Sequence, residues 1–247
     1  MDRFNTIVAG LLAIALTPAA ASAALLTGSY TAIPSVDGDT SGFVNFADEG
    51  TVDWVLWNST SPTAVPTQEK AGGTAISSAT AVGVGTTLND VGGTDLSFST
   101  VSGATSGSQF SRALAAQPFN SSGQGVGLSI TVPTLDTYHA RIYVGGFRVT
   151  LATITATLSG ATPLVATDTF DVGDGGKDAG VLNLTFTPDS LSGGDNVLNV
   201  SIVLTTDDPG SDSHVLMQGA TLSIIPEPGS LALLGLGGLS IAVGRRR

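Results

Sequence analysis

The sequence predicts an all-β protein: an antiparallel, jelly-roll-like β-sandwich that spans residues 24–225. The main observation is an alternation of apolar residues with polar or small ones, which is the pattern of strands with one buried face. Segments rich in Gly, Asp, Asn and Pro separate these stretches at intervals of about 10–15 residues, as in sandwiches built from many short strands. No stretch of this region has the periodicity of an amphipathic helix.

The alternation is clearest in two segments. In 126–132, Val, Leu and Ile alternate with Gly, Ser and Thr, and 198–205 has a similar pattern. The expected strands, in chain order, are 51–57, 96–100, 126–132, 141–144, 148–158, 165–170, 182–187, 198–205 and 215–224. Turns are expected at 171–180, 188–196 and 207–213.

The stretch 64–127 is rich in Gly, Ser, Thr and Ala and contains fewer strong strand patterns. We expect long loops between strands there, which belong to the same domain and are anchored by Phe98, Phe110 and Phe119. The alternative is a two-domain chain with a break near 105–125.

The N-terminus has the pattern of a secretory signal peptide. Arg3 precedes an apolar run at 7–16, and Pro18 leads into a small-residue segment. Ala21 and Ala23 form the A-x-A site that signal peptidase requires, so cleavage is expected after Ala23. An uncleaved anchor or a core helix is the alternative, although the apolar run is short for a membrane span.

The C-terminus combines a Pro-Glu-Pro turn, an apolar stretch at 231–243 and a terminal arginine cluster that resists translocation. This order resembles the PEP-CTERM sorting signal of Gram-negative bacteria. The resemblance implies that an exosortase, a membrane protease-transpeptidase, processes the chain near the Pro-Glu-Pro segment. The expected sorting residues are Pro226, Glu227, Pro228, Arg245, Arg246 and Arg247.

The apolar tail is short. As a helix, 229–244 would be about 24 Å long, whereas the bilayer core is about 30 Å thick. The tail therefore predicts a transient membrane stop: a precursor held in the inner membrane, and a mature form at the cell surface or outside the cell. Both apolar runs, 7–16 and 231–243, are expected to be helices outside the sandwich.

The composition and charge of the chain argue against several classes of function. Without its two ends the chain keeps 5 basic and 18 acidic residues, a formal charge of −13. Such an acidic surface argues against nucleic acid as a partner and keeps an exported protein soluble. The chain has no cysteine, which excludes disulfides and thiol chemistry.

Nucleotide-binding, zinc-protease and serine-hydrolase motifs are absent from the sequence. We therefore expect that the protein is not an enzyme. The alternative is a glycosidase built from paired Asp residues.

Two short motifs bear on the function of the core. Residues 49–57 read EGTVDWVLW, with Lys70-Ala71-Gly72 downstream, and 141–147 read RIYVGGF. They resemble a bacterial extracellular module found beside glycoside hydrolases and similar to galactose-binding-like carbohydrate-binding sandwiches. The chain departs from that pattern at Val55 or Leu56, where His is frequent, and at Phe147, where Trp is usual. The resemblance implies a candidate ligand site at Trp54, Trp57, Lys70, Arg141, Tyr143 and Phe147.

Trp54 and Trp57 are the only tryptophans. Three residues apart on an extended strand, they face opposite sides of the sheet, so one is expected in the core and the other more exposed. An exposed indole can stack on the apolar face of a sugar ring. The alternative is that both tryptophans are structural and that Lys70 and Arg141 form salt bridges.

A candidate calcium site lies in an acidic, glycine-rich segment at Asp168, Asp171, Asp174 and Asp178. Calcium prefers carboxylate and carbonyl oxygens, and loops of sandwiches supply them. The spacing differs from that of the EF-hand loop, and a solvated turn is the alternative.

Two functions therefore remain. The first is a non-catalytic surface or matrix protein associated with exopolysaccharide or biofilm. The second is a carbohydrate-binding module with a sugar site at the tryptophans. The expected partners are signal peptidase, exosortase and an extracellular polysaccharide.

Overall fold

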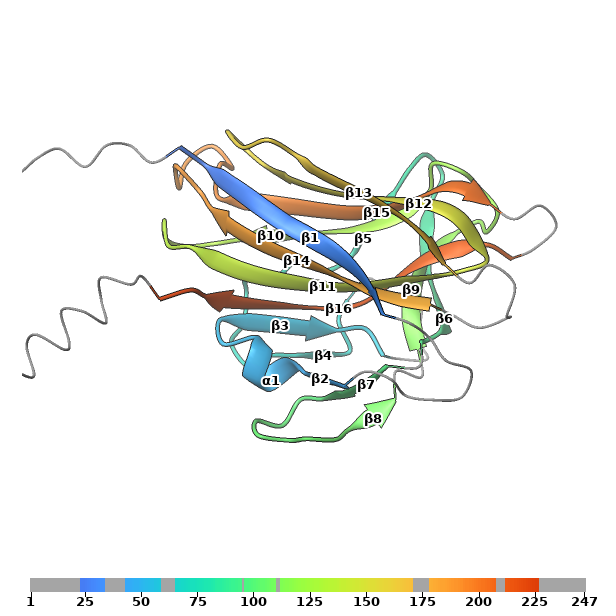
Figure 1. The fold of residues 1–247 in the computed structure, drawn as a ribbon, viewed down its shortest axis with the longest axis horizontal. Coiled ribbons are helices and arrows are strands. Elements are labelled where there is room, and N and C mark those ends of the chain that lie inside the picture. Colours follow the sequence, from blue (N-terminus) through green and yellow to red (C-terminus); the bar gives the residue numbers. More distant parts are fainter. Residues whose placement is uncertain are drawn as a thin grey trace, which may run out of the picture.

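The computed structural model describes residues 23–33, 43–58, 65–94, 96–109, 112–170, 178–207 and 212–226. Two antiparallel sheets are stacked face to face and enclose the main core (Figure 1). This architecture confirms the predicted all-β sandwich. The two predicted terminal helices lie outside the described residues. Within those residues, no helix has the length and apolar character needed to cross a bilayer.

The first sheet has β16 (His214–Ile224) at its centre. On one side β16 pairs with β11 (Tyr138–Phe147), which is followed by β14 (Asp178–Thr187) and β1 (Leu25–Ile33). On its other side β16 pairs first with β9 (Arg112–Gln117) and then with β3 (Asp53–Leu56). The strands β6 (Thr87–Gly92) and β4 (Gln68–Glu69) complete these two branches.

The second sheet has the order β13, β12, β15, β10 and β5. From β13 to β16, successive strands alternate between the two sheets, which is the jelly-roll type of connection. The bounds of its strands are β5 (Thr80–Val82), β10 (Gly125–Thr131), β12 (Val149–Leu158), β13 (Leu164–Phe170) and β15 (Val197–Asp207).

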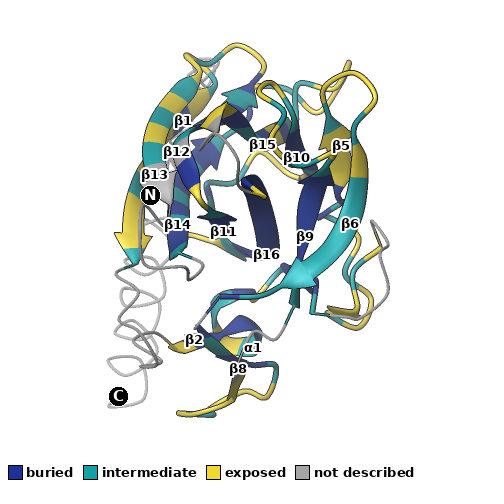
Figure 2. Cartoon of the chain, turned by 90° about the vertical axis from the view of Figure 1, so that its right-hand side faces the viewer, coloured by how far each residue is buried: buried dark blue, intermediate teal, exposed yellow. Residues whose placement is uncertain are grey.

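Burial follows from this layering. The alternating apolar residues of β10 and β15 point between the sheets and form part of the main core. From His214 to Leu222 every residue of β16 is buried, because that strand has neighbours on both edges and on both faces (Figure 2). The last strand of the domain is therefore also its most enclosed one.

A second, smaller core lies on the outer face of the first sheet. It is covered by the one-turn helix α1 (Phe46–Glu49) and by a three-stranded sheet of β2 (Phe43–Asn45), β7 (Ser97–Ser99) and β8 (Ser108–Gln109). The Asn45 side chain caps α1 by accepting hydrogen bonds from the amides of Ala47 at 3.2 Å and Asp48 at 3.3 Å. Phe46 packs against the rings of Trp54 and Tyr143, with centroids 6.2 and 5.4 Å away.

Each of the predicted strands overlaps an observed one, but β1 was not predicted and one predicted turn was wrong in its extent. The predicted turn at 171–180 extends too far, because β14 already includes 178–180. The stretch 64–127 contains β4 to β9 and the start of β10, separated by turns and loops, as expected. Within it, β9 pairs with β16 of the main sheet, which argues against a domain break near 105–125.

Candidate functional site

A polar area occupies part of the outer face of the first sheet. On β11, His139 and Arg141 are two residues apart and therefore project to the same side. The strand register places His139 between Thr185 of β14 and Ser223 of β16, and places Arg141 beside Asn183. These side chains form a continuous polar surface that ends against α1.

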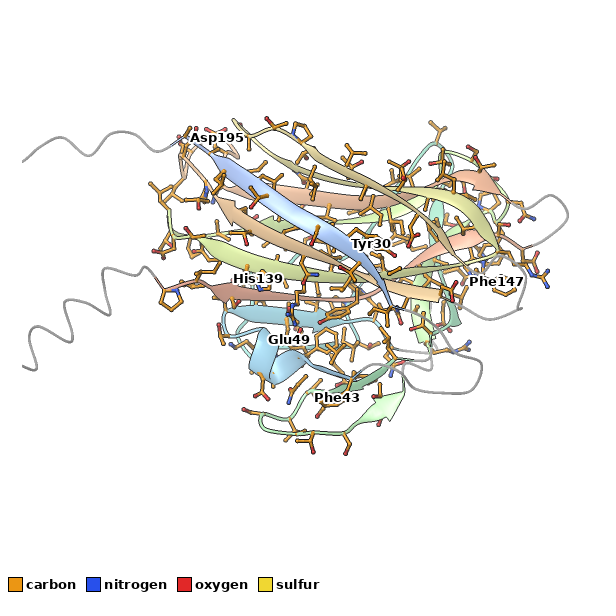
Figure 3. All side chains as sticks on the ribbon, in the orientation of Figure 1. Tyr30, Phe43, Glu49, His139, Phe147 and Asp195 are labelled. Atoms are coloured by element: carbon orange, nitrogen blue, oxygen red, sulfur yellow. The ribbon has the colours of Figure 1, made fainter. Side chains whose placement is uncertain are left out.

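Glu49, the last residue of α1, connects the helix to β11. One of its carboxylate oxygens lies 2.8 Å from a terminal guanidinium nitrogen of Arg141. The other accepts a hydrogen bond of 2.5 Å from the Tyr143 hydroxyl. Figure 3 shows Glu49 and His139 on the same side of the molecule. The two sequence motifs therefore meet in space, since Glu49 belongs to the first and Arg141 and Tyr143 belong to the second.

The charges of this cluster follow from burial and from Glu49. Burial, and then the Glu49 carboxylate, raise the pKa of Tyr143 far above its ordinary value, so its hydroxyl stays protonated and donates. Burial acts to lower the pKa of Arg141, but the effects of Glu49 and Tyr143 together outweigh it and the pKa rises. Burial and the Arg141 charge lower the pKa of His139 against the weaker effect of Glu49, which makes its imidazole neutral at pH 7.

These side chains line a surface depression of about 360 Å³. Within the described ranges, the Nε of Arg141 is buried and has no hydrogen-bond partner. A neutral imidazole, a guanidinium and two hydroxyl groups can bind a polar ligand through several hydrogen bonds. The lining residues are Asp48, Glu49, Thr51, His139, Arg141, Ser223 and Ile224.

Asp48 has a structural role at the edge of the depression. Its carboxylate accepts hydrogen bonds from the Ser102 hydroxyl at 2.6 Å, the Gly103 amide at 3.0 Å and the Asn45 side chain at 2.7 Å. The carboxylate holds the loop after β7 against α1, so α1 is fixed and Glu49 with it.

The first motif contains a second structural carboxylate, Asp53. Its oxygens accept hydrogen bonds from the amides of Trp54 at 2.8 Å, Ala75 at 2.8 Å and Ile76 at 2.9 Å. Lys70 donates from Nζ to the carbonyls of Gly50 and Thr51. Lys70 therefore ties the segment after β4 to the turn between α1 and β3, and bonds main-chain carbonyls rather than the carboxylate of the expected alternative.

Both tryptophans are buried, and the expectation of an exposed one was wrong. They do face opposite sides of β3, as predicted: Trp57 packs in the main core, and Trp54 packs in the smaller core under α1. The short strands and the helix that cover Trp54 were not foreseen. Neither indole face is available for stacking on a sugar ring, since Trp54 is 8% exposed and Trp57 is 2% exposed.

Of the remaining predicted ligand residues, Tyr143 is buried at 3% exposure, and its hydroxyl donates to Glu49. Phe147 is at the opposite end of the molecule from His139 (Figure 3). It packs there 5.5 Å from the His214 ring and beneath the Arg148 guanidinium. Only Arg141 of the predicted set borders the depression, and His139 and Ser223 were missed. The period-two spacing of His139 and Arg141 was the available signal.

The candidate calcium residues are divided. Asp171 and Asp174 lie outside the described residues, whereas Asp168 and Asp178 lie on β13 and β14. Burial, and then the Asp168 carboxylate, raise the pKa of Tyr30 on β1 well above its ordinary value. Among the described side chains, no group of three His, Cys, Asp or Glu residues is placed to hold a metal ion.

The processing residues lie at the ends of the described chain. Ala23 and Pro226 are exposed. Ala21, Glu227, Pro228 and the three terminal arginines lie outside the described residues.

Comparison with known families identifies the tail. Residues 225–247 match a family model described as the PEP-CTERM protein-sorting motif. The prediction from the tail is therefore confirmed: the chain carries a PEP-CTERM motif, which marks an exported protein and implies processing by exosortase. A search of curated proteins gave no match.

Several solved structures are distantly similar to the sandwich. The TmCBM61 structure in complex with β-1,4-galactotriose has a TM-score of 0.34 and 9% identity, over 60% of this chain and 88% of that chain. The CBM22-1 xylan-binding domain from Paenibacillus barcinonensis Xyn10C has a TM-score of 0.32 and 8% identity, over 70% and 94%. Arabinose-bound MgGH51 α-L-arabinofuranosidase has a TM-score of 0.34 and 15% identity, and this chain spans 29% of its length.

Proposed function

We propose that this protein is a non-catalytic component of the cell surface or extracellular matrix, exported, processed at both ends and associated with exopolysaccharide. The observation that carries the proposal is the PEP-CTERM motif, which begins where the fold ends. The Ile225 amide donates a hydrogen bond of 2.8 Å to the Thr137 carbonyl, and the next residue, Pro226, is exposed. Cleavage near Glu227 would therefore remove the tail and leave every strand in place.

The N-terminal end supports the same scheme. Strand β1 begins at Leu25, and Ala23 is exposed. Cleavage after Ala23 would leave a single residue before the strand. The mature domain, 24–225, is then a complete sandwich that depends on neither sorting segment.

A non-catalytic role is supported by the state of the carboxylates at the depression. The carboxylates of Asp48 and Glu49 each make two or more hydrogen bonds or ion pairs with other residues of the domain. A general acid or base needs a carboxylate that can reach the substrate, and these two already fix α1 in place.

Association with polysaccharide is supported by the sheet surfaces. The outer face of the second sheet presents hydroxyl side chains, among them Thr153, Thr155 and Thr157 on β12 and Ser201 on β15, which are half-buried at most. Hydroxyl and amide groups on both outer faces can exchange hydrogen bonds with a hydrated glycan along its length. We expect the mature protein to stay with the cells of an exopolysaccharide-producing strain and to move into the medium of a strain that makes none.

The processing step is tested by two tail variants. We expect Glu227→Ala to leave an uncut, membrane-bound precursor, since the change alters the segment that exosortase reads. We expect replacement of Arg245, Arg246 and Arg247 by Ala to let the tail slip through the membrane, so that unprocessed protein escapes. Fractionation and blotting separate the two outcomes. Identical, fully processed protein from both variants would contradict the assignment.

The second candidate function is binding of a defined glycan, and the observation that favours it is the depression beside Arg141. With both tryptophans buried, such a site would rely on hydrogen bonds from Arg141, His139 and Ser223 rather than on stacking. Arg141→Ala is expected to weaken glycan-array binding by the mature protein at least tenfold.

Arg112→Ala is the matched control for that variant. The Arg112 side chain is 37% exposed and paired with Asp90 at 3.2 Å, whereas Arg141 is 38% exposed and paired with Glu49. The control should bind as the wild type does. Equal binding by both variants would place any glycan elsewhere.

A further inference from the structure

Both processing points are at one end of the sandwich, here called the terminal pole, where β1 begins and β16 ends (Figure 1). The register pairs Leu25 with Thr187, and the Thr187 and Thr137 hydroxyls are 2.9 Å apart. Thr137 in turn accepts the hydrogen bond from Ile225. Leu25 and Ile225 therefore lie at the same end of the sheet, at the two outer members of a row of four neighbouring strands (β1, β14, β11 and β16).

The terminal pole carries large aliphatic side chains that the fold leaves exposed. The exposed fractions are 47% for Leu25, 50% for Leu135, 42% for Ile224 and 39% for Ile225. Leu135 belongs to this group because it lies two residues before Thr137 in the loop between β10 and β11. Asp136 and Asp195 are close by, and each accepts a hydrogen bond from a neighbouring hydroxyl.

The length of chain beyond the pole limits how far the domain can stand from the membrane. The predicted apolar segment begins at Leu231, five residues after Pro226. Fully extended, five residues reach at most about 18 Å. The polar layer on each side of a bilayer core is about 5–8 Å thick, from the difference between total and core thickness. A tail inserted at Leu231 therefore keeps the pole close to the lipid headgroups.

We propose that the terminal pole is a lipid-docking surface in the precursor, with its aliphatic side chains at the headgroup boundary of the membrane that holds the tail. This inference rests on the proposed function, because the tail must insert. Four half-exposed side chains bind lipid weakly alone, but a short tether holds them at an effective concentration of about millimolar. Cleavage near Glu227 removes the tether, so the mature domain leaves the surface. The nearby aspartates make anionic lipid the poorer partner.

The absence of cysteine allows a direct test with single-cysteine variants of the full-length chain. Leu135→Cys reports on the pole, Leu239→Cys reports on the tail, and Val84→Cys reports on the far end. Val84 is fully exposed in the β5–β6 loop, and β15, with 11 residues, separates the two ends by roughly 35 Å at about 3.3 Å per residue. Each variant is labelled with a fluorophore and reconstituted into phosphatidylcholine vesicles that contain a nitroxide-labelled lipid.

We expect strong quenching at positions 135 and 239 and none at 84. A Gly-Ser spacer of about twelve residues inserted after Pro228 should reduce quenching at 135 at least twofold and leave 239 unchanged, because it lowers the effective concentration. Replacing part of the lipid by phosphatidylglycerol should also reduce quenching at 135. Quenching at 239 with none at 135 would overturn the docking surface and leave the proposed function standing. No quenching at 239 would overturn both.

Discussion

The carboxylate of Glu49 joins α1 to β11, because it bonds Arg141 and Tyr143 together. Arg141 is thereby held at the edge of the depression with its Nε pointing to no partner among the described residues. Tyr143 supplies a buried donor that stabilises the Glu49 carboxylate from below. The geometry of the polar area thus depends on one side chain from a four-residue helix.

The first prediction concerns Tyr143 and pH. Its pKa is raised in the folded state above the value of about 10 expected for the unfolded chain, so its stabilising contribution is present below about pH 10 and is lost as the pH rises further. The unfolding free energy should fall less steeply above pH 10 in Tyr143→Phe than in the wild type, with a slope smaller by up to about 1.4 kcal/mol per pH unit. Urea denaturation between pH 8 and pH 11 measures both slopes, and equal slopes would refute the prediction. Tyr30, whose pKa is also raised, keeps part of the slope in the variant.

The second prediction concerns Asp53, whose two oxygens accept three main-chain amides while it is 1% exposed. Asp53→Asn replaces one carboxylate oxygen with an NH2 group, which then faces the main-chain N–H groups that the oxygen accepted from. We expect a loss of about 3 kcal/mol of unfolding free energy, from weakened charged hydrogen bonds and an unpaired amide. Asp136→Asn, at a surface loop, is the control and should change stability by no more than about 0.5 kcal/mol. Equal effects of the two changes in denaturant melts would show that Asp53 does not hold the loop at 75–76.

Of the residues that border the depression, the sequence predicted Arg141 as a ligand residue but not its neighbours His139 and Ser223. The motif residues were identified by type, and three of them, Trp54, Trp57 and Tyr143, proved to be packing residues. A buried tryptophan and a sugar-stacking tryptophan have the same sequence signature. What separates them is a cover, here α1 and the small sheet, which comes from segments remote in the chain.

At the level of elements, α1 reaches the sheet because Gly219 leaves room on β16. A Cβ at Gly219 would lie 2.6 Å from the Phe46 ring and 2.9 Å from the Val55 carbonyl oxygen. The absence of a side chain there lets the Phe46 ring pack closely against the strand. The position of Glu49, three residues along α1, follows from that contact.

The third prediction tests this contact. Gly219→Ala should cost about 1–3 kcal/mol, because the added methyl group overpacks the small core. Phe46→Leu in the same chain should recover part of that loss, with a coupling of at least about 0.5 kcal/mol in a double-mutant cycle measured by urea denaturation. Strictly additive effects would mean that Phe46 does not contact β16.

Most of the long strands were predicted, with β1 as the exception, and most of the short ones were not, with β7 as the exception. Strands such as β10 and β15 alternate over seven or more residues, which gives a clear two-residue period. In contrast, β2, β4 and β8 have two or three residues, too few for any period. Strand β9 reads Arg-Ala-Leu-Ala-Ala-Gln, and alanine has low strand propensity, so pairing with β16 rather than local preference forms it.

At the scale of the whole molecule, the proposed function has the two ends determine where the domain goes, and in the fold both ends lie outside the strands. Strand β1 is at the edge of the first sheet and β16 is at its centre, yet both reach the terminal pole. The sorting segments therefore attach at one place. If the terminal pole docks on lipid as proposed, the rest of the acidic, cysteine-free sandwich faces away from the membrane, and 24–225 carries a formal charge of −13.

The most direct test of export with processing at both ends is the intact mass of the native protein recovered from the cell surface and the medium. We expect a chain that begins at Ala24 and ends near Glu227, without residues 1–23 and without Arg245, Arg246 and Arg247. Recovery of the full 247-residue chain from those fractions would contradict the account.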